Sequence, residues 1–260
     1  MKKVFAMILS VVMILSLFAG CGGKADASDL AYIQDKGKLV VGITDYAPMD
    51  YKDENGEWTG FDAEFARLVA KELGVEVEFF LIADWSKKVF ELDSKNIDCI
   101  WNGMTINEEL LSICSVSDPY VINAQVVVMK ADAVGNYPDA ESLAELTFAV
   151  ENGSAGQVAA QDIGVKNIVA VQDQAAALME VAAGTADACV IDITMAYAMT
   201  GEGTSYEALA VGLTLTSEEY GIGFRKGSDV TAKVNEIMAK FMEDGTLDAL
   251  AEKYNLTLAK

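Results

Sequence analysis

The most unusual polar position in this chain is Asp192, which directly follows an apolar run over residues 188–191. A carboxylate at the end of a buried strand is costly unless it meets a partner, so Asp192 is expected to face a cleft and contact a ligand there. Two aromatic residues, Tyr46 and Trp85, stand beside strand and loop ends. Aromatic side chains at such places belong either to the core or to the wall of a pocket, and their positions favour the pocket. The chemistry that these residues could support is the binding of a small molecule.

The composition excludes several classes of function. The chain has 260 residues with 40 acidic and 19 basic side chains, no histidine, and a formal net charge of −21. The lack of histidine removes Ser-His-Asp and Cys-His catalysis and histidine-bearing zinc sites. No other metal site is readable, so we predict no catalytic residue, no metal and no cofactor. The acidic balance argues against nucleic acid as a partner, because that affinity depends on lysine and arginine.

The N-terminus has the layout of a secretory signal peptide. A short cationic start precedes an apolar run over residues 4–18, which is too short to span a bilayer comfortably. Small residues then precede Cys21 in a stretch that resembles a bacterial lipobox. We expect residues 1–20 to be a signal peptide, Cys21 to carry lipid such as palmitate, and residues 21–35 to tether the protein to the outer face of the cell membrane. The alternative is an ordinary cleaved signal followed by an incidental cysteine.

Three further cysteines, Cys99, Cys114 and Cys189, occur in the exported part. A disulfide between Cys99 and Cys114 is conceivable in an exported protein. The odd number of cysteines, their apolar neighbours and the lack of a Cys-x-x-Cys spacing favour buried free thiols instead.

Strand and helix patterns alternate in the first half of the exported part. An apolar strand is predicted over residues 38–43, and helical periodicity with one apolar face over residues 61–73. Further strands are predicted over residues 75–82 and 97–101, with helical residues 85–93 between them. This alternation indicates an α/β fold with parallel strand pairs.

A second unit repeats the pattern, and its elements are predicted at residues 146–150, 157–162, 167–171, 174–183 and 188–191. A strand over residues 220–224 follows, and then two helices that pack back on the first unit, the first of them capped by Ser228 and Asp229.

Two crossings connect the units. The chain passes from the first unit to the second near residues 126–131 and returns near residues 218–224. Two crossings form a hinge, so the cleft between the units is the expected ligand site.

The order of these motifs resembles the extracellular solute-binding proteins of family 3, the amino-acid-binding subunits of ABC importers. The similarity extends over residues 36–256. Each motif is a weak signal by itself, whereas eight in the same order are a strong one. They lie at residues 40–48, 60–62, 96–106, 117–120, 151–156, 186–192, 220–223 and 244–246.

The resemblance implies a two-lobed type II periplasmic-binding-protein fold with the ligand cleft between its lobes. The first lobe would comprise residues 36–127 and 219–260, and the second residues 128–218. The implied protein is a monomer without enzymatic activity. It would capture a small polar amino acid or related amine outside the membrane and deliver it to an ABC permease.

The resemblance also assigns roles to individual residues. Tyr46 would pack on the ligand side chain, with Asp45 beside it and Trp85 as a second wall. Backbone N–H groups at a helix start would receive a carboxylate, and Asp192 would pair with an α-ammonium group. The full set implied to bind the ligand is Asp45, Tyr46, Trp85, Asn102, Gly103, Met104, Thr105, Ser154, Ala155 and Asp192.

One position departs from the family pattern. Members usually carry an arginine four or five residues after the threonine matched by Thr105, where it clamps the α-carboxylate of the ligand. Residues 106–111 contain no base, and the two arginines of the chain, Arg67 and Arg225, lie in the first helix and after the returning strand. The ligand is therefore either an amino acid held by N–H groups and hydroxyls alone or an organic cation without a carboxylate. A sensory lipoprotein and a dehydratase-like enzyme are the alternative functions.

Overall fold

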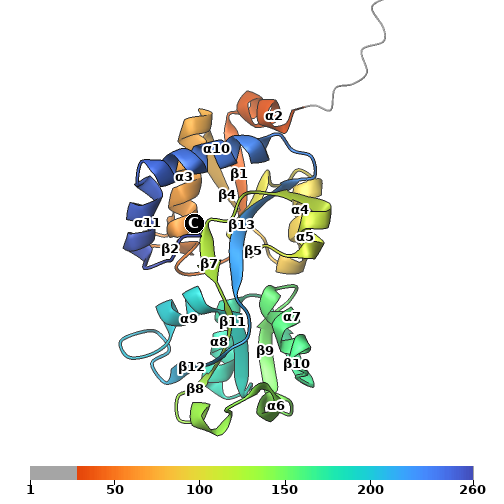
Figure 1. Cartoon of the computed structure of the whole chain (residues 1–260), viewed down its shortest axis with the longest axis vertical. Helices are drawn as coiled ribbons and strands as arrows, with labels where there is room; N and C mark the ends of the chain where they lie inside the picture. The colour runs from red at the N-terminus through yellow and green to blue at the C-terminus, as the bar shows by residue number, and fades with distance from the viewer. Residues whose placement is uncertain (1–27, 260) are drawn as a thin grey trace, which may run out of the picture.

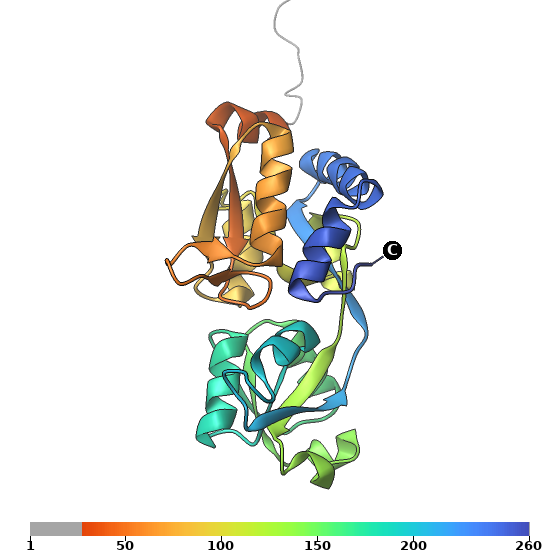
Figure 2. The same ribbon diagram turned by 90° about the vertical axis from the view of Figure 1, so that its left-hand side faces the viewer.

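The computed structural model describes residues 28–259, which form two α/β lobes joined by two extended crossings (Figure 1, Figure 2). The expected signal peptide at residues 1–20 and the expected lipid attachment at Cys21 lie outside the described residues. Within residues 28–259, no helix has the length and apolar character needed to cross a membrane. The same residues contain no group of three or more side chains able to hold a metal ion.

The first lobe is built on a sheet of six strands, namely β1 (Lys38–Ile43), β4 (Glu76–Leu81), β5 (Cys99–Thr105), β6 (Cys114–Val116), β7 (Val121–Asn123) and β13 (Glu218–Arg225). The strand order is β4-β1-β5-β13-β6, and β7 pairs with β13. Strands β4, β1 and β5 run parallel, whereas β13 returns from the second lobe and runs antiparallel to β5. The carboxyl ends of the parallel strands therefore point toward the second lobe (Figure 1).

The other elements of the first lobe are α2 (Asp29–Lys36), β2 (Tyr51–Lys52), β3 (Trp58–Thr59), α3 (Phe61–Leu73), the short helix η1 (Trp85–Lys87), α4 (Lys88–Asp93), α5 (Glu108–Ile113), α10 (Val230–Glu243) and α11 (Thr246–Tyr254). Helices α10 and α11 contact α3, which confirms that the C-terminal helices pack on the first lobe (Figure 1, Figure 2).

Helix α3 shows how the sequence determines an element. Its apolar residues recur with helical spacing, and the buried ones include Phe61, Phe65 and Val69. The helix ends at Gly74, which adopts the left-handed conformation with φ 75° and donates its N–H to the last turn. The predicted helix over residues 61–73 is confirmed with the same bounds.

The second lobe is built on the strands β8 (Gln125–Lys130), β9 (Thr147–Glu151), β10 (Asn167–Val171), β11 (Ala188–Asp192) and β12 (Leu209–Thr214). Its helices are η2 (Val134–Asn136), α6 (Ala140–Leu143), α7 (Ala155–Asp162), α8 (Gln174–Ala183) and α9 (Ile193–Met199). The strand order is β10-β9-β11-β8-β12, with β10, β9 and β11 parallel and β8 antiparallel to both of its neighbours. The carboxyl ends of β9 and β11 point toward the first lobe (Figure 1).

The two crossings run side by side between the lobes. Strand β7 leads into β8 on the way out, and β13 begins on the way back, where Glu218 pairs with Asn123. Strand β8 pairs with β11 from Gln125 onward, so it belongs to the second sheet along its whole length. The expected lobe boundary between residues 127 and 128 therefore falls inside β8. The sequence could not place this boundary, since an apolar run alone does not show with which sheet a strand pairs.

Two expectations about individual residues are resolved by their surroundings. Cys99, Cys114 and Cys189 are free and buried, which matches the free-thiol alternative. Asp229 stands at the start of α10 but makes no side-chain cap there. Its carboxylate instead accepts from the Ser28 hydroxyl at 2.5 Å and from the Leu30 backbone N–H at 3.0 Å, so it stabilises the start of α2.

Candidate ligand-binding site

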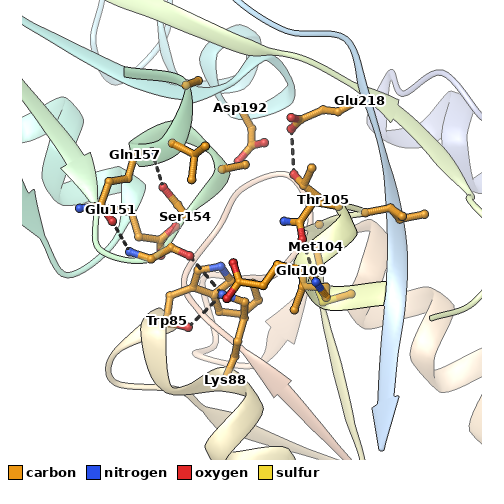
Figure 3. A pocket seen from close by; sticks show the side chains of 18 of the residues that line it. Trp85, Lys88, Met104, Thr105, Glu109, Glu151, Ser154, Gln157, Asp192 and Glu218 are labelled. Carbon is orange, nitrogen blue, oxygen red and sulfur yellow. Dashed lines mark hydrogen bonds between the residues drawn. The ribbon is translucent and has the colours of Figure 1, made fainter. Parts of the chain in front are cut away.

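A cavity of about 770 Å³ lies between the lobes, which is a volume suited to a small molecule. Its lining comes from the carboxyl ends of β5, β9 and β11, the start of α7, the η1–α4 segment and the beginning of β13. Figure 3 shows Asp192 and Glu218 at the upper end of the view, and Trp85 and Lys88 at the lower end. Ligands of α/β proteins commonly bind where parallel strands end, because loops and helix starts there leave polar groups free.

Asp192 ends strand β11 and lines the cavity. It is 5% exposed, and its carboxylate accepts from the side-chain amides of Asn123, Gln125 (2.7 Å) and Gln174. Burial raises the pKa of Asp192 to about 7, and the negative charge of Glu218 adds to this rise. Three neutral amides therefore hold a carboxylate in place without neutralising it.

Glu218 was not identified from the sequence. It begins β13 at the return crossing and lines the cavity. Its Oε1 accepts from the Thr105 hydroxyl at 2.8 Å, the Asn123 amide at 2.6 Å and the Gln125 amide at 2.7 Å. The signal that could have identified Glu218 was its place in a polar stretch at a predicted crossing between the lobes. A charged residue at such a hinge lies close to the cleft.

Glu151 ends β9, beside the end of β11, and lines the cavity with 4% of its surface exposed. Its Oε1 has no hydrogen-bond partner among the described residues. Burial raises the pKa of Glu151 well above its usual value, and the charges of Asp192 and Asp173 act in the same direction. A second buried acid therefore belongs to the site, although the sequence marked it only as the first residue of the motif over residues 151–156.

Lys88 is the single lysine or arginine among the described residues that line the cavity. Its Nζ donates to the carbonyl of Gly153 in the second lobe at 3.1 Å and lies 4.9 Å from the centre of the Trp85 ring. Burial lowers its pKa, although nearby acids oppose the effect. Lys88 lies one helical turn after Trp85, which the sequence analysis places in the wall of the pocket. This spacing was the signal that could have identified Lys88 as a residue of the site.

Helix α7 begins at the cavity with Ser154 as its N-cap. The Ser154 hydroxyl accepts from the backbone N–H of Gln157 at 3.1 Å, so it stabilises the helix start. Ser154 and Ala155 both line the cavity, and the first N–H groups of a helix have no acceptor within the helix. The positive end of the helix dipole makes this edge suitable for a carboxylate. Helix α7 begins at Ala155, two residues before the predicted start.

The structure brings together eight of the ten residues implied by the resemblance; the cavity is lined by Trp85, Asn102, Gly103, Met104, Thr105, Ser154, Ala155 and Asp192. Some of their polar groups already have partners. Asn102 exchanges two hydrogen bonds with Thr44, at 2.6 and 2.8 Å, and the N–H of Gly103 donates to Asp62 at 2.6 Å. These groups shape the floor of the cavity.

Asp45 and Tyr46 are not among the residues that line the cavity. Asp45 is exposed, whereas Tyr46 is 2% exposed and lies against Gly103, where an added Cβ would come within 2.5 Å of the Tyr46 ring. The Tyr46 hydroxyl bonds to Thr194 of the second lobe at 2.6 Å and to Tyr220. Tyr46 therefore connects the lobes beneath the cavity floor in this structure.

Neither arginine reaches the cavity. Arg225 is held by Asp29 at 2.9 Å and by the carbonyl of Ile97 at 2.8 Å, and Arg67 donates to the carbonyl of Trp58 at 2.6 Å. Both guanidinium groups therefore form their hydrogen bonds within the first lobe. The sequence-based expectation that neither replaces the missing carboxylate clamp agrees with these positions.

The ligand-free protein is expected to become more stable as the pH falls from 8 to 5.5. Burial raises the pKa values of Asp192, to about 7, and of Asp50 and Glu151. The native state then binds protons more tightly than the unfolded chain, whose carboxyl groups titrate near pH 4, so the free energy of unfolding falls as pH rises between about 4 and 7. Calorimetry measures the melting temperature, and Asp192→Asn should flatten part of the dependence. A melting temperature highest at pH 8 would contradict the expectation.

Two α/β lobes, a double crossing and a polar cavity between the lobes define the class of two-lobed solute receptors. The sequence profile of the bacterial extracellular solute-binding proteins, family 3, matches residues 39–257, and the chain belongs to this family. The L-cystine-binding protein TcyJ of Escherichia coli (strain K12) is 31% identical over 249 residues, covering 94% of this chain and 92% of that protein.

Solved structures show the same architecture. A mutant of the arginine-binding protein ArgBP from T. maritima superposes with a TM-score of 0.81 at 31% identity, covering 87% of this chain and 98% of that one. The ancestral amino-acid-binding protein AncCDT-1, described as a precursor of cyclohexadienyl dehydratase, gives a TM-score of 0.80 at 35% identity, covering 87% and 99%. The two-lobed fold inferred from the sequence is confirmed, and the relatives are mostly binding proteins.

Proposed function

We propose that the protein is the substrate-binding lipoprotein of an ABC importer, which captures a small amino acid or a related amine outside the membrane. Its relatives include the cystine-binding and arginine-binding proteins described above, and its family binds solutes outside the cell. The apolar N-terminal run and Cys21 support export and lipid anchoring. A lipid-anchored monomer would deliver its ligand to the permease in the same membrane.

The observation that carries the proposal is the position of Asp192, a buried carboxylate in the cavity with no base bonded to it in the described chain. An ammonium group of the ligand would pair with Asp192 in a charge-assisted hydrogen bond. A carboxylate, where the ligand has one, would bind at the start of α7 near Lys88, which lies beside Gly153. Trp85 offers an apolar face for the rest of the ligand.

The same lining favours binding over catalysis. In the described part of the chain, the titratable side chains around the cavity are one lysine and five acids, namely Lys88, Glu109, Glu151, Asp162, Asp192 and Glu218. Catalysis of the dehydratase kind needs a positioned general acid and a cationic clamp on the carboxylates of the substrate. Lys88 alone offers little of such a clamp, since its Nζ already bonds to backbone carbonyls. We therefore assign the cavity a binding role.

A thermal-shift screen of the mature protein tests the proposal. The panel contains the standard amino acids, cystine, polyamines and quaternary amines. A ligand present at about 100 times its dissociation constant stabilises the folded state by about 2.7 kcal/mol. For a chain of this size this raises the melting temperature by several degrees, on the order of 5 °C. The proposal expects such a shift with at least one of these compounds, and a panel without any shift would refute it.

A further inference from the structure

Asp192 and Glu218 both lie at one end of the cavity (Figure 3), and shared amide donors join them into one hydrogen-bonded unit. The side-chain amide of Gln125 donates to Asp192 Oδ1 and to Glu218 Oε1, at 2.7 Å in each case. The side-chain amide of Asn123 donates to the same two oxygens. Each amide nitrogen has two hydrogens, so both amides use all of them to bridge the carboxylates. These neutral groups hold the two acids close together without cancelling either charge.

No base neutralises this pair. Among residues 28–259, neither Asp192 nor Glu218 takes part in an ion pair. Lys88, the base that lines the cavity, donates to the carbonyls of Gly153 and Trp85 instead. Asp192 is buried and Glu218 is partly buried, and two like charges so placed without a counter-charge are unfavourable. A positively charged ligand would compensate them.

An unpartnered polar atom of the cavity lining supplies independent evidence for a ligand that donates hydrogen bonds. Glu151 lines the same cavity and is 4% exposed, and its Oε1 accepts no hydrogen bond from any of residues 28–259. Buried acceptors of this kind are costly when left unpaired. An ammonium or guanidinium N–H group of the ligand would satisfy the Glu151 acceptor.

We propose that Glu218 determines ligand specificity: together with Asp192 it forms a doubly negative subsite that selects solutes with more positive than negative charge, such as basic amino acids or diamines. The inference rests on the proposed function and names the ligand class of that site. A single α-ammonium group compensates one of the two carboxylates, so a neutral zwitterion leaves the other carboxylate of the cavity without a counter-charge. A second cationic group on the ligand removes this penalty.

Protons compete with a cationic ligand for Asp192. The titratable groups that face Asp192 are Glu218, Glu151, Tyr46 and Tyr220, and none of them is basic. Burial and the charge of Glu218 raise the pKa of Asp192 to about 7. A bound cation favours the ionised carboxylates, so affinity for a cation is greatest above pH 7 and falls as the pH drops below it.

Three probes of similar shape test the inference by calorimetric titration at pH 8. L-arginine has a net positive charge, L-citrulline is its neutral near-isostere, and agmatine is arginine without the carboxylate. The variant is Glu218→Gln, and the control is Glu219→Gln, which changes an exposed neighbour outside the cavity lining. We expect the wild type to bind arginine or agmatine at least about tenfold more tightly than citrulline. Glu218→Gln should remove most of this preference, and Glu219→Gln should retain it.

A second measurement separates charge from structure. Removing the charge of Glu218 should lower the pKa of Asp192, which carbon-13 NMR of the carboxyl groups reports without any ligand. An unchanged pKa in folded Glu218→Gln would overturn the inference. So would equal affinity of the wild type for arginine and citrulline, or no binding of any of the three probes. Each of these three results leaves the proposed function intact if another amino acid or amine gives a thermal shift.

Discussion

Replacing Asp192 with asparagine is expected to lower affinity for the amino acid or amine that gives the largest thermal shift by about a hundredfold or more. The side chain keeps its size, but the ligand ammonium loses the carboxylate with which it pairs in a buried site. Breaking one partner of a buried ion pair typically costs about 3–5 kcal/mol, because the remaining charge is left uncompensated. Calorimetric titration of the wild type and the variant measures the loss.

Asp187→Asn is the matched control, because Asp187 precedes the same strand at the end away from the cavity. Its carboxylate accepts from the backbone N–H of Thr147 at 2.9 Å, and it does not line the cavity. We expect its affinity to match the wild type, with at most a small loss of stability. Equal affinity of Asp192→Asn and the wild type would refute the role assigned to Asp192, whatever the ligand is.

The fold could be predicted from the sequence where local patterns decide it. Helix α3 has the predicted bounds because apolar spacing and a following glycine define both its face and its end. Strand β5 was predicted over residues 97–101, but it extends from Cys99 to Thr105. Its polar end continues the strand because β13 pairs with it up to Thr105. Such long-range pairing, like the membership of β8 in the second sheet, is decided by tertiary structure.

The candidate site was predictable where a residue contrasts with its neighbours. Asp192 was conspicuous because it follows an apolar run, and it does line the cavity. Glu218 lies in a polar stretch, so nothing local distinguishes it from a surface acid. Its place in the cavity depends on the pairing of Glu218 with Asn123 between the crossings. Tyr46 shows the opposite case, since its position beside a strand end does not reveal that its ring lies under Gly103.

Residues that meet the ligand site also connect the lobes. Gln125 belongs to the second sheet, Asn123 and Glu218 to the crossings, and Thr105 to the first sheet, and all of them take part in the hydrogen bonds around Glu218. A ligand that pairs with these acids therefore contacts both lobes and the hinge at once. Binding energy at this point favours the arrangement in which the lobes are together.

Gly153→Ala is expected to weaken ligand binding by about tenfold or more, because it disfavours this arrangement. Gly153 belongs to the second lobe and has φ 73°. An added Cβ would come within 2.7 Å of the Cα and Cβ of Ser86 in the first lobe. The clash exists only when the lobes meet, so each lobe keeps its own packing. Calorimetric titration measures the affinity, and small-angle scattering with ligand measures how compact the protein becomes.

The control for backbone strain is Gly164→Ala, which separates the conformational cost from the clash. Gly164 also has a left-handed conformation, with φ 81°, but an added Cβ would meet no atom within 4 Å. Both substitutions should cost about 1–2 kcal/mol of stability, since alanine avoids this conformation. Only Gly153→Ala should lose affinity and remain expanded with ligand. If both variants bind as tightly as the wild type, then the contact between Gly153 and Ser86 does not belong to the ligand-bound state.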